Sequence, residues 1–373
     1  MNGPPRGKVT PLQRIHLTHP GLEKTLLSEL KRSLPNSRHA ELYSGVVRSD
    51  VHHADAQINT TIAFASQTLA AAEEVSAATV SRWVQLLGDK IIQSLEGSEN
   101  PWRLHIFPIQ SQDGYVGERR CELIEQELYA YLERKQRRLL RTMNENSTSW
   151  WLPDETLVQL GMLTVDRGFL SCLSAIDRQR MQGALSILPA GALKIRDDKR
   201  PPSRAYRKLI EAQAHLGLAI GSGHQCVDLG ASPGGWSWVA LEQGASVIAV
   251  DRAPLRDDLM RHERIRFVQG DGFAFEPEGV VDWLLCDIIA FPERSIELIE
   301  AWVSKKLCRA LVVTVKFRGS EDYERLEALK TFLRLPANRC VIRHLSSNKN
   351  EVTVAAQFES FPVVAVEPSA SAG

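Results

Sequence analysis

From residue 203 onward, apolar runs alternate with amphipathic stretches in a regular order. The apolar runs are HQCVDLGAS (224–232), SVIAVD (246–251), VDWLLCDII (281–289) and RALVVTVKF (309–317). They are largely apolar and rich in residues that favour strands, which is typical of strands buried on both faces of a parallel sheet. Stretches with helical spacing lie between them, and CVIRHLSS and EVTVAAQF predict a terminal strand pair. The order predicts a doubly wound α/β domain over 203–360, with its ligand at the carboxyl ends of the strands.

The first half of the chain has a different, mixed pattern. RIHLTHPGLEKTLLSELKRSLP predicts a strand and an amphipathic helix, and ELYSGVVRSD predicts one further strand, which suggests a small subdomain over 1–60. Helical stretches at 80–97 and 121–143 and strands in WRLHIFPI and TLVQLGMLTVDRGFLSCLS follow. Residues 61–175 contain no catalytic constellation. We therefore expect an N-terminal α+β region that serves as a binding module.

The segment 176–202 reads as an irregular, basic linker, because the pair Pro201-Pro202 interrupts any helix. We expect the tail 361–373 to be disordered.

Composition narrows the possible partners. The chain of 373 residues has 45 basic and 45 acidic side chains, so a polyanion must be held by a local patch. Two basic segments, 134–141 at the end of a helix and 194–207 in the linker, are candidates for holding RNA phosphates; a solvated helix end is the alternative for the first. There is no secretory leader and no long apolar span, so we expect a cytoplasmic protein without membrane contact.

The cysteines and histidines do not suggest a metal centre. The 6 cysteines lie far apart without CxxC pairs, and the 10 histidines show no metal-ligand spacing. We expect free thiols and no metal. Cys286 lies inside a buried strand, where it is not placed to act as a nucleophile.

A glycine-rich turn follows the first apolar strand. In DLGASPGGW the glycines are Gly230, Gly234 and Gly235, and Ser232-Pro233 stands where a dinucleotide fingerprint has its second glycine. A cofactor without a pyrophosphate fits this turn better, and S-adenosylmethionine (SAM) is the commonest one on this fold. A nicotinamide cofactor remains the alternative.

Two acids at strand ends are placed to bind an adenosine. Asp251 ends the second strand, where an acid binds ribose hydroxyls, and Asp271 follows the third strand and is expected to meet the adenine edge. Acids at strand ends are also common for structural reasons. Trp236 and Trp238, after the turn, are interpreted as core residues.

The combined motifs resemble the FtsJ-type ribosomal RNA 2′-O-methyltransferases. DLGASPGGW is preceded by PSRAYRKLIEA and followed by LLCDII, TVKFRG and KNEVTV. That family carries a Lys–Asp–Lys–Glu tetrad, which falls here on Lys208, Asp287, Lys316 and Glu351. The resemblance implies a SAM-dependent methyltransferase with a Rossmann-like fold.

Within this group the chain is most similar to the RlmM branch, the bacterial large-subunit rRNA cytidine 2′-O-methyltransferases. That similarity implies a ferredoxin-like piece at 1–60, a THUMP-like RNA-binding domain at 61–175 and 23S rRNA as substrate. We expect the protein to be a monomer. Where many relatives have Asp-Met-Ala-Pro, this chain has Asp287-Ile288-Ile289-Ala290, so the loop that lines the target nucleotide differs.

Ser203 matches a family position near the methionine moiety of SAM; its other interpretation is the N-cap of a helix over 204–215. The complete set of expected cofactor-binding residues is Ser203, Gly230, Ser232, Pro233, Gly234, Gly235, Asp251, Asp271 and Asp287.

The tetrad also makes chemical sense by itself. A ribose 2′-hydroxyl is a weak nucleophile, so a base must take its proton as it attacks the methyl group. Burial and a second ammonium disfavour the charged form of a lysine. We expect Lys316 to be the general base, Asp287 its partner, and Lys208 and Glu351 orienting residues. For these four residues the alternative is a surface ion-pair network. For the whole protein the alternatives are a non-catalytic RNA-binding or ribosome-assembly protein and a nicotinamide oxidoreductase.

Overall fold

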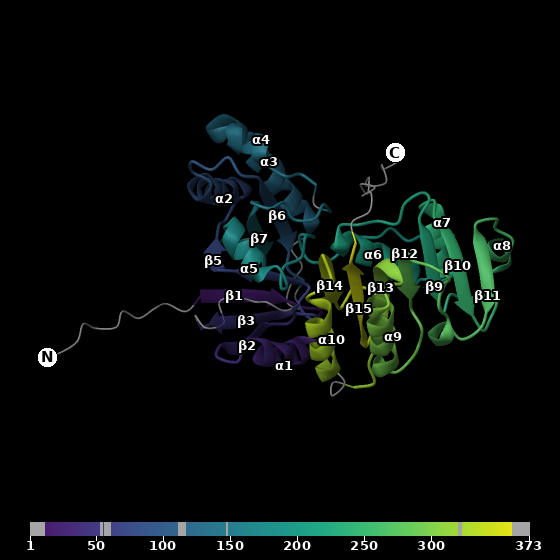
Figure 1. Ribbon diagram of the computed structural model, residues 1–373. Coiled ribbons are helices and arrows are strands. Elements are labelled where there is room, and N and C mark those ends of the chain that lie inside the picture. The colour runs from purple at the N-terminus through teal and green to yellow at the C-terminus, as the bar shows by residue number, and fades with distance from the viewer. Residues whose placement is uncertain are drawn as a thin grey trace. The chain divides into compact units, whose positions relative to one another are not determined.

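The computed structural model describes residues 12–52, 55, 61–110, 117–146, 148–319 and 323–359. They form two compact units (Figure 1): the first comprises most of the chain up to Leu185, and the second comprises the chain from Ser186 onward with two short segments that end at Ser66 and Trp151. The expected disordered tail 361–373 and the N-terminal residues 1–11 lie outside the described residues. In the part that is described, no helix is long and apolar enough to cross a membrane.

A seven-stranded sheet forms the centre of the second unit. Its strands are, in spatial order, β11 (Ile265–Gln269), β10 (Ser246–Asp251), β9 (Gln225–Leu229), β12 (Val281–Cys286), β13 (Cys308–Lys316), β15 (Glu351–Gln357) and β14 (Arg339–Arg343). Neighbours from β11 to β13 are parallel, whereas β15 runs antiparallel to both β13 and β14. The predicted mostly parallel sheet and terminal strand pair are confirmed. After β9 the chain adds β10 and β11 on one side of that strand and then adds β12 and β13 on its other side. Such a reversal of strand order leaves a crevice for a ligand at the carboxyl ends of the two strands where it occurs, here β9 and β12.

Helices pack on both faces of this sheet (Figure 1). They are α6 (Tyr206–Leu216), α7 (Gly235–Glu242), α8 (Asp257–Met260), α9 (Pro292–Ser304) and α10 (Arg325–Leu333). Trp283 and Leu285 of β12 pack with α6 and α7, while the alternate residues Leu284 and Cys286 are equally buried on the opposite face. This burial on both sides explains the largely apolar strands. Trp236 is 3% exposed within the same core, as predicted.

The helix α6 begins later than predicted and ends at a glycine. Its N-cap is Ala205, and no side chain caps the helix, so the interpretation of Ser203 as N-cap is wrong. Gly217 at the other end has a φ of +60°, a left-handed conformation that favours glycine because glycine has no Cβ. Leu218 N then donates a hydrogen bond to Gln213 O at 3.2 Å, which closes the end of the helix.

The first unit contains two four-stranded sheets, with orders β2-β3-β1-β4 and β5-β8-β7-β6. Its elements are β1 (Leu12–Leu17), α1 (Glu23–Ser33), β2 (Arg38–Tyr43), β3 (Val46–Val51), β4 (Gln67–Ala70), β5 (Glu73–Ser76), α2 (Val80–Ser94), β6 (Trp102–Pro108), α3 (Glu118–Gln136), α4 (Arg138–Thr142), β7 (Thr156–Met162), β8 (Arg167–Leu173) and α5 (Ala175–Met181).

Three local predictions for this unit differ from the structure. The stretch ELYSGVVRSD forms two strands rather than one, because the chain reverses at Gly45, whose φ is +75°. The long helix is divided at Arg137 into α3 and α4. The expected irregular segment 176–202 includes most of α5, in which the buried Arg178 donates to the carbonyl of Glu155 at 2.8 Å.

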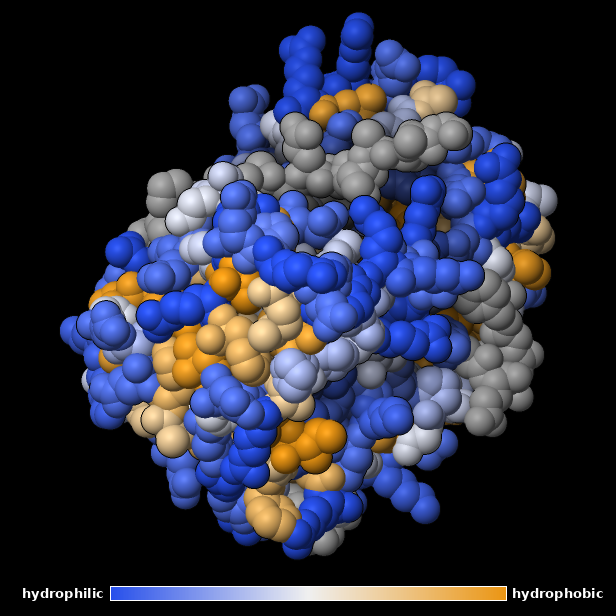
Figure 2. All heavy atoms as spheres, turned by 90° about the vertical axis from the view of Figure 1, so that its right-hand side faces the viewer, coloured by the Kyte–Doolittle hydropathy of each residue, from blue (hydrophilic) through white to orange (hydrophobic). Residues whose placement is uncertain are grey.

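The face of the molecule beside the edge strand β11 carries apolar side chains in patches that hydrophilic side chains separate (Figure 2). Residues of β11 are half-buried or exposed, as expected for an edge strand.

The close packing around Gly217 generates a stability prediction. A Cβ at Gly217 would lie 2.9 Å from the backbone nitrogen of Trp150, whereas a Cβ at Gly223, whose φ is +80°, would meet nothing within 4 Å. We expect Gly217→Ala to lower the free energy of unfolding by at least about 1 kcal/mol more than Gly223→Ala, because both variants carry backbone strain and only the first adds a clash. Urea denaturation measures the difference, and equal midpoints for the two variants would contradict the packing described.

Candidate active site

Four charged residues from four elements converge beside the carboxyl ends of the central strands. Lys208 comes from α6, Asp287 follows β12, Lys316 ends β13 and Glu351 begins β15. The register of β13 against β15 pairs Lys316 with Glu351 directly.

The distances within this group show two cations bound between two carboxylates. Lys208 Nζ lies 2.6 Å from Glu351 Oε1 and 3.1 Å from Asp287 Oδ2. Lys316 Nζ lies 3.0 Å from Asp287 Oδ1 and 3.9 Å from Glu351 Oε2, and it donates to the backbone carbonyl of Asp287 at 2.9 Å. The structure therefore brings together all four residues that the sequence singled out.

This group is not a surface ion-pair network. The side chains of Lys208, Asp287, Lys316 and Glu351 are 12, 17, 18 and 8% exposed. Charges held this far from water are stable only when each is paired and hydrogen-bonded, and each of the four is.

The two lysines differ in their surroundings. Burial disfavours the charge on Lys208, but the nearby carboxylates of Asp287 and Glu351 outweigh burial and raise the pKa of Lys208. Lys208 thus remains an ammonium near neutral pH. Lys316 lines the adjoining cavity, and Lys208 is not among the lining residues.

Thr314 also holds Asp287 in place, and sequence reasoning missed it. Its hydroxyl donates to Asp287 Oδ1 at 2.6 Å, and its side chain is fully buried. Thr314 precedes Lys316 by two residues, so both side chains point to the same face of β13. The sequence feature that could have pointed to Thr314 is a single hydroxyl side chain within the largely apolar run LVVTVKF.

Glu211 was missed as well and connects α6 to the β14–β15 turn. Its buried carboxylate accepts hydrogen bonds from Ser346 N at 3.1 Å and from the Ser346 hydroxyl at 2.7 Å. Burial raises its pKa, and the bonds from Ser346 only partly oppose that effect. Glu211 lies one helical turn after Lys208, and Ser346 lies in the turn that leads to Glu351. This link between Glu211 and Ser346 therefore helps to hold Lys208 and Glu351 in position relative to each other.

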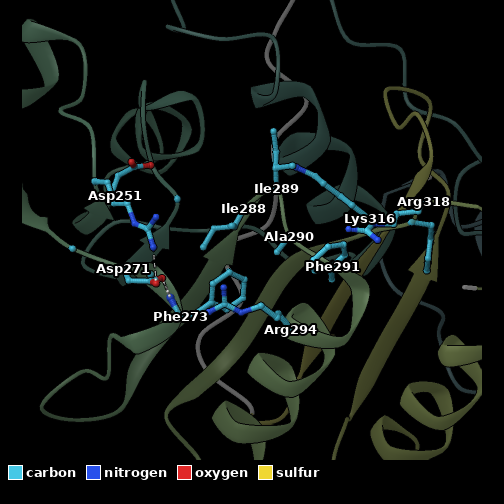
Figure 3. A pocket seen from close by; sticks show the side chains of 15 residues that line it. Asp251, Asp271, Phe273, Ile288, Ile289, Ala290, Phe291, Arg294, Lys316 and Arg318 are labelled. Carbon is cyan, nitrogen blue, oxygen red and sulfur yellow. Dashed lines mark hydrogen bonds and ion pairs between the residues drawn. The ribbon is translucent and has the colours of Figure 1, made fainter.

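A cavity of about 620 Å³ runs along the carboxyl ends of the strands (Figure 3). Asp251 and Asp271 lie at one end, and Lys316, Phe291 and Arg318 lie at the other. The lining residues are Gly230, Asp251, Arg252, Gly270, Asp271, Gly272, Phe273, Ile288, Ile289, Ala290, Phe291, Arg294, Lys316, Phe317 and Arg318. Its volume is typical of a site for a cofactor-sized molecule.

Of the expected cofactor-binding residues, Gly230, Asp251 and Asp271 line this cavity. Asp251 Oδ2 accepts from Ser232 N at 3.0 Å, so the turn orients the acid. Asp271 accepts from Phe273 N and pairs with Arg252 at 2.8 Å.

The other expected cofactor-binding residues do not line the cavity. Ser203, Ser232, Pro233, Gly234, Gly235 and Asp287 are absent from its lining. The position of a Cβ at Gly234 is occupied by the side chain of Leu259, and at Gly235 by the hydroxyl of Ser203. The two glycines thus permit close packing around the first turn of α7. Phe273 and Arg294, which no motif suggested, line the cavity instead, with the Arg294 guanidinium 4.0 Å from the centre of the Phe273 ring.

Asp228 is buried beneath the glycine-rich turn. It accepts a hydrogen bond from the Ser237 hydroxyl at 2.7 Å. Burial raises the pKa of Asp228 to about 7, because the bonds from Ser237 do not compensate for the loss of water.

No group of His, Cys, Asp and Glu that suits a metal ion is present in the described ranges, and the cysteines there are free.

Comparisons with known proteins show what the second half of the chain is similar to. The family model for FtsJ-like methyltransferases matches residues 201–360, which confirms the predicted resemblance for this part of the chain. The chain is 32% identical to a ribosomal RNA large subunit methyltransferase M of Thauera aminoaromatica over 196 residues, covering 50% of this chain and 54% of that protein. It is 36% identical to the protein of the same name from Marinobacter nauticus over 181 residues, covering 45% and 50%. The chain thus spans about half the length of the curated relatives it matches.

The buried Asp228 predicts a pH-dependent stability. Its pKa is about 7 in the folded protein against an ordinary 3.8, so between about pH 4 and 7 the folded state holds a proton that the unfolded state releases, and the contribution of Asp228 to stability falls as the pH rises through this window. We expect Asp228→Asn to gain in melting temperature relative to the wild type between pH 5 and pH 8. The matched control is Asp258→Asn, since Asp258 is exposed and its pKa is lowered. A constant difference between wild type and Asp228→Asn across this range would contradict the assignment.

Proposed function

We propose that this protein is a SAM-dependent RNA ribose 2′-O-methyltransferase that acts on large-subunit ribosomal RNA. The observation that carries the proposal is the buried group of Lys208, Asp287, Lys316 and Glu351 at one end of a cofactor-sized cavity. The names of the similar proteins support the RNA class.

The cavity suits SAM better than a dinucleotide. The carboxylate of Asp251 accepts two backbone hydrogen bonds, from Ser232 N and Ala253 N, and retains acceptor capacity for ribose hydroxyls. The first turn of α7 is packed against Leu259 and Ser203, which leaves little room for the pyrophosphate that a nicotinamide cofactor would bring there. When bound, SAM supplies an electrophilic methyl group.

The residues of the tetrad divide the remaining work. Lys316, which lines the cavity, would first release its own ammonium proton and then accept the hydroxyl proton at Nζ, while the ribose oxygen takes the methyl carbon whose bond to the sulfur of SAM breaks. Lys208 keeps its charge and is unsuited to accept that proton. Asp287 holds Lys316 through both its carboxylate and its carbonyl, and Thr314 holds the carboxylate.

We further infer that the first unit binds RNA in a monomeric, cytosolic enzyme. In this proposal 1–60 is a ferredoxin-like piece to whose sheet β4 adds a strand, 61–175 is a THUMP-like domain, and 176–202, which includes most of α5, leads to the second unit. Some residues of the two basic segments, 134–141 and 194–207, have structural contacts instead. In the first segment, Arg138 donates to the carbonyls of Ser98 and Leu95 at 2.6 and 3.1 Å. In the second segment, Arg200 pairs with Asp198 at 2.7 Å and Arg207 pairs with Asp197 at 2.7 Å. Arg134, Lys135, Arg137 and Arg141 of the first segment and Arg196, Lys199 and Arg204 of the second segment remain candidates for phosphate contacts.

Replacement of Lys316 tests the reaction. Lys316→Arg retains a positive charge that can pair with Asp287, but a guanidinium does not give up its proton. We expect at least a 100-fold loss in kcat for methyl transfer to rRNA from cells that lack the gene, with SAM affinity nearly unchanged. The matched control is Lys305→Ala, because Lys305 is exposed in the same unit and pairs with the exposed Glu276.

The same variants can be followed in cells by mapping ribose methylation across the rRNA. Loss of one 2′-O-methyl site in the deletion strain, restored by the Lys305→Ala gene and not by the Lys316→Arg gene, is the expected outcome. Full restoration of that methyl site by Lys316→Arg would refute Lys316 as the general base, whereas a deletion strain that loses no methyl site would favour a non-catalytic assembly role.

Replacement of Asp251 tests the cofactor. We expect SAM, and not NAD, to raise the melting temperature of the protein, and Asp251→Asn to weaken SAM binding at least 10-fold through loss of ribose hydrogen bonds. Asp258→Asn is the control for a lost carboxylate, because the side chain of Asp258 in α8 is exposed and pairs with Arg256. Stabilisation by NAD instead of SAM would support the oxidoreductase alternative.

A further inference from the structure

One buried aromatic residue contacts the neighbours in sequence of both Lys316 and Glu351. Tyr323 lies between β13 and α10. Its ring centre is 4.8 Å from that of Phe317, the residue that follows Lys316, in an edge-to-face arrangement. Its hydroxyl donates a hydrogen bond at 2.6 Å to Oδ1 of Asn350, the residue that precedes Glu351. Tyr323 thus holds the chain immediately beside one lysine and one carboxylate of the tetrad.

Phe317 and Asn350 extend the pairing of β13 with β15 by one position. Phe317 N donates to Asn350 O at 2.9 Å, and Asn350 Nδ2 donates to Phe317 O at 2.8 Å. The adjacent pair of the two strands is Lys316 and Glu351, which lie directly opposite each other. A contact that fixes Phe317 and Asn350 therefore also limits how far the side chains of Lys316 and Glu351 can separate.

The ring of Tyr323 is supported in turn by a residue from the first half of the sequence. Phe64 is buried, and its ring centre lies 4.7 Å from that of Tyr323. Phe64 belongs to the short segment of the second unit that ends at Ser66. Arg343 of β14 anchors this segment, because its guanidinium donates to the carbonyl of Ser66 at 2.6 Å. The FtsJ-like region begins at residue 201, so Phe64 supports the site from outside that region.

We propose that Tyr323 is a positioning residue for Lys316 and Glu351, and that Phe64 acts through Tyr323. The proposal rests on the proposed function, because it takes Lys316 to accept the proton of the ribose hydroxyl. Tyr323 is absent from the lining of the cavity, so it acts through its neighbours rather than on the reacting atoms. A reacting group that is misplaced by about 1 Å can lower a rate about 100-fold, which is why a residue outside the cavity can affect the reaction.

Methylation of rRNA from cells that lack the gene tests the role of Tyr323, with kcat expressed per protein that binds SAM. We expect Tyr323→Phe to lower kcat about 10-fold, because it removes the hydrogen bond to Asn350 and keeps both ring contacts. The KM for RNA and the Kd for SAM should change less than 2-fold. The matched control is Tyr131→Phe, because the Tyr131 hydroxyl also donates to a side-chain oxygen, that of Asp89, at 2.6 Å. This control should keep the kcat of the wild type.

A second background separates positioning from a general loss of structure. When Lys316→Arg is already present, Tyr323→Phe should cause almost no further loss in single-turnover rate, because the base that Tyr323 positions is gone. A purely structural effect would lower the rate by the same factor in both backgrounds, and that result would overturn the proposal.

Replacement of Phe64 tests its action through Tyr323. We expect Phe64→Ala to lower kcat as Tyr323→Phe does, and Phe64→Leu to restore most of it by filling the space behind the ring. A wild-type kcat in Phe64→Ala would show that Phe64 takes no part.

Failure of this proposal is distinguishable from failure of the proposed function. A wild-type protein that methylates no RNA would refute the proposed function. An active wild type, with Tyr323→Phe behaving like Tyr131→Phe, would refute the positioning role alone. Tyr323→Phe leaves the packing of the rings intact, so it remains decisive even if Phe64→Ala does not fold.

Discussion

The carboxylate of Asp287 is shared between two ammonium groups, and most of the site depends on this arrangement. Its oxygens lie 3.1 Å from Lys208 Nζ and 3.0 Å from Lys316 Nζ, so a single side chain ties helix α6 to strand β13. With Glu351 the charges balance, which is what allows four ionised groups to lie largely out of water. Removal of one partner from such a group leaves a buried charge uncompensated and costs about 3 to 5 kcal/mol. The same interactions therefore hold the elements together and set the geometry for proton removal.

Several features of the second unit followed directly from the sequence. Runs such as ALVV (310–313) and WLLC (283–286) are apolar at every position because both faces of their strands are covered, and that pattern predicted the parallel sheet correctly. Lys208, Asp287 and Lys316 were found from their motifs, since each lies at a strand end or in a helix beside the crevice. Glu351 was found in the same way, at the start of a recognisable strand.

Other features depend on packing that no local pattern records. The bond between Glu211 and Ser346 joins residues 135 positions apart, so neither residue stood out alone. Gly234 and Gly235 matched a cofactor motif, but the side chains of Leu259 and Ser203 fill the space beside them. Phe273 enters the cavity because a short helical turn, η2 (Gly272–Ala274), redirects the chain after Asp271. The hairpin at Gly45 was read as one strand because its turn is only two residues long.

The direction of one strand decides whether the fourth charged residue reaches the site at all. In a uniformly parallel sheet every strand would present its last residue at the crevice, and the first residue of β15 would emerge at the far edge. Because β15 runs against its neighbour β13, its opening residue Glu351 arrives opposite the closing residue Lys316. A shift of one position in that pairing would turn Glu351 to the other side of the sheet. The reversal of chain direction at this single strand is thus what delivers the second negative charge to the lysines.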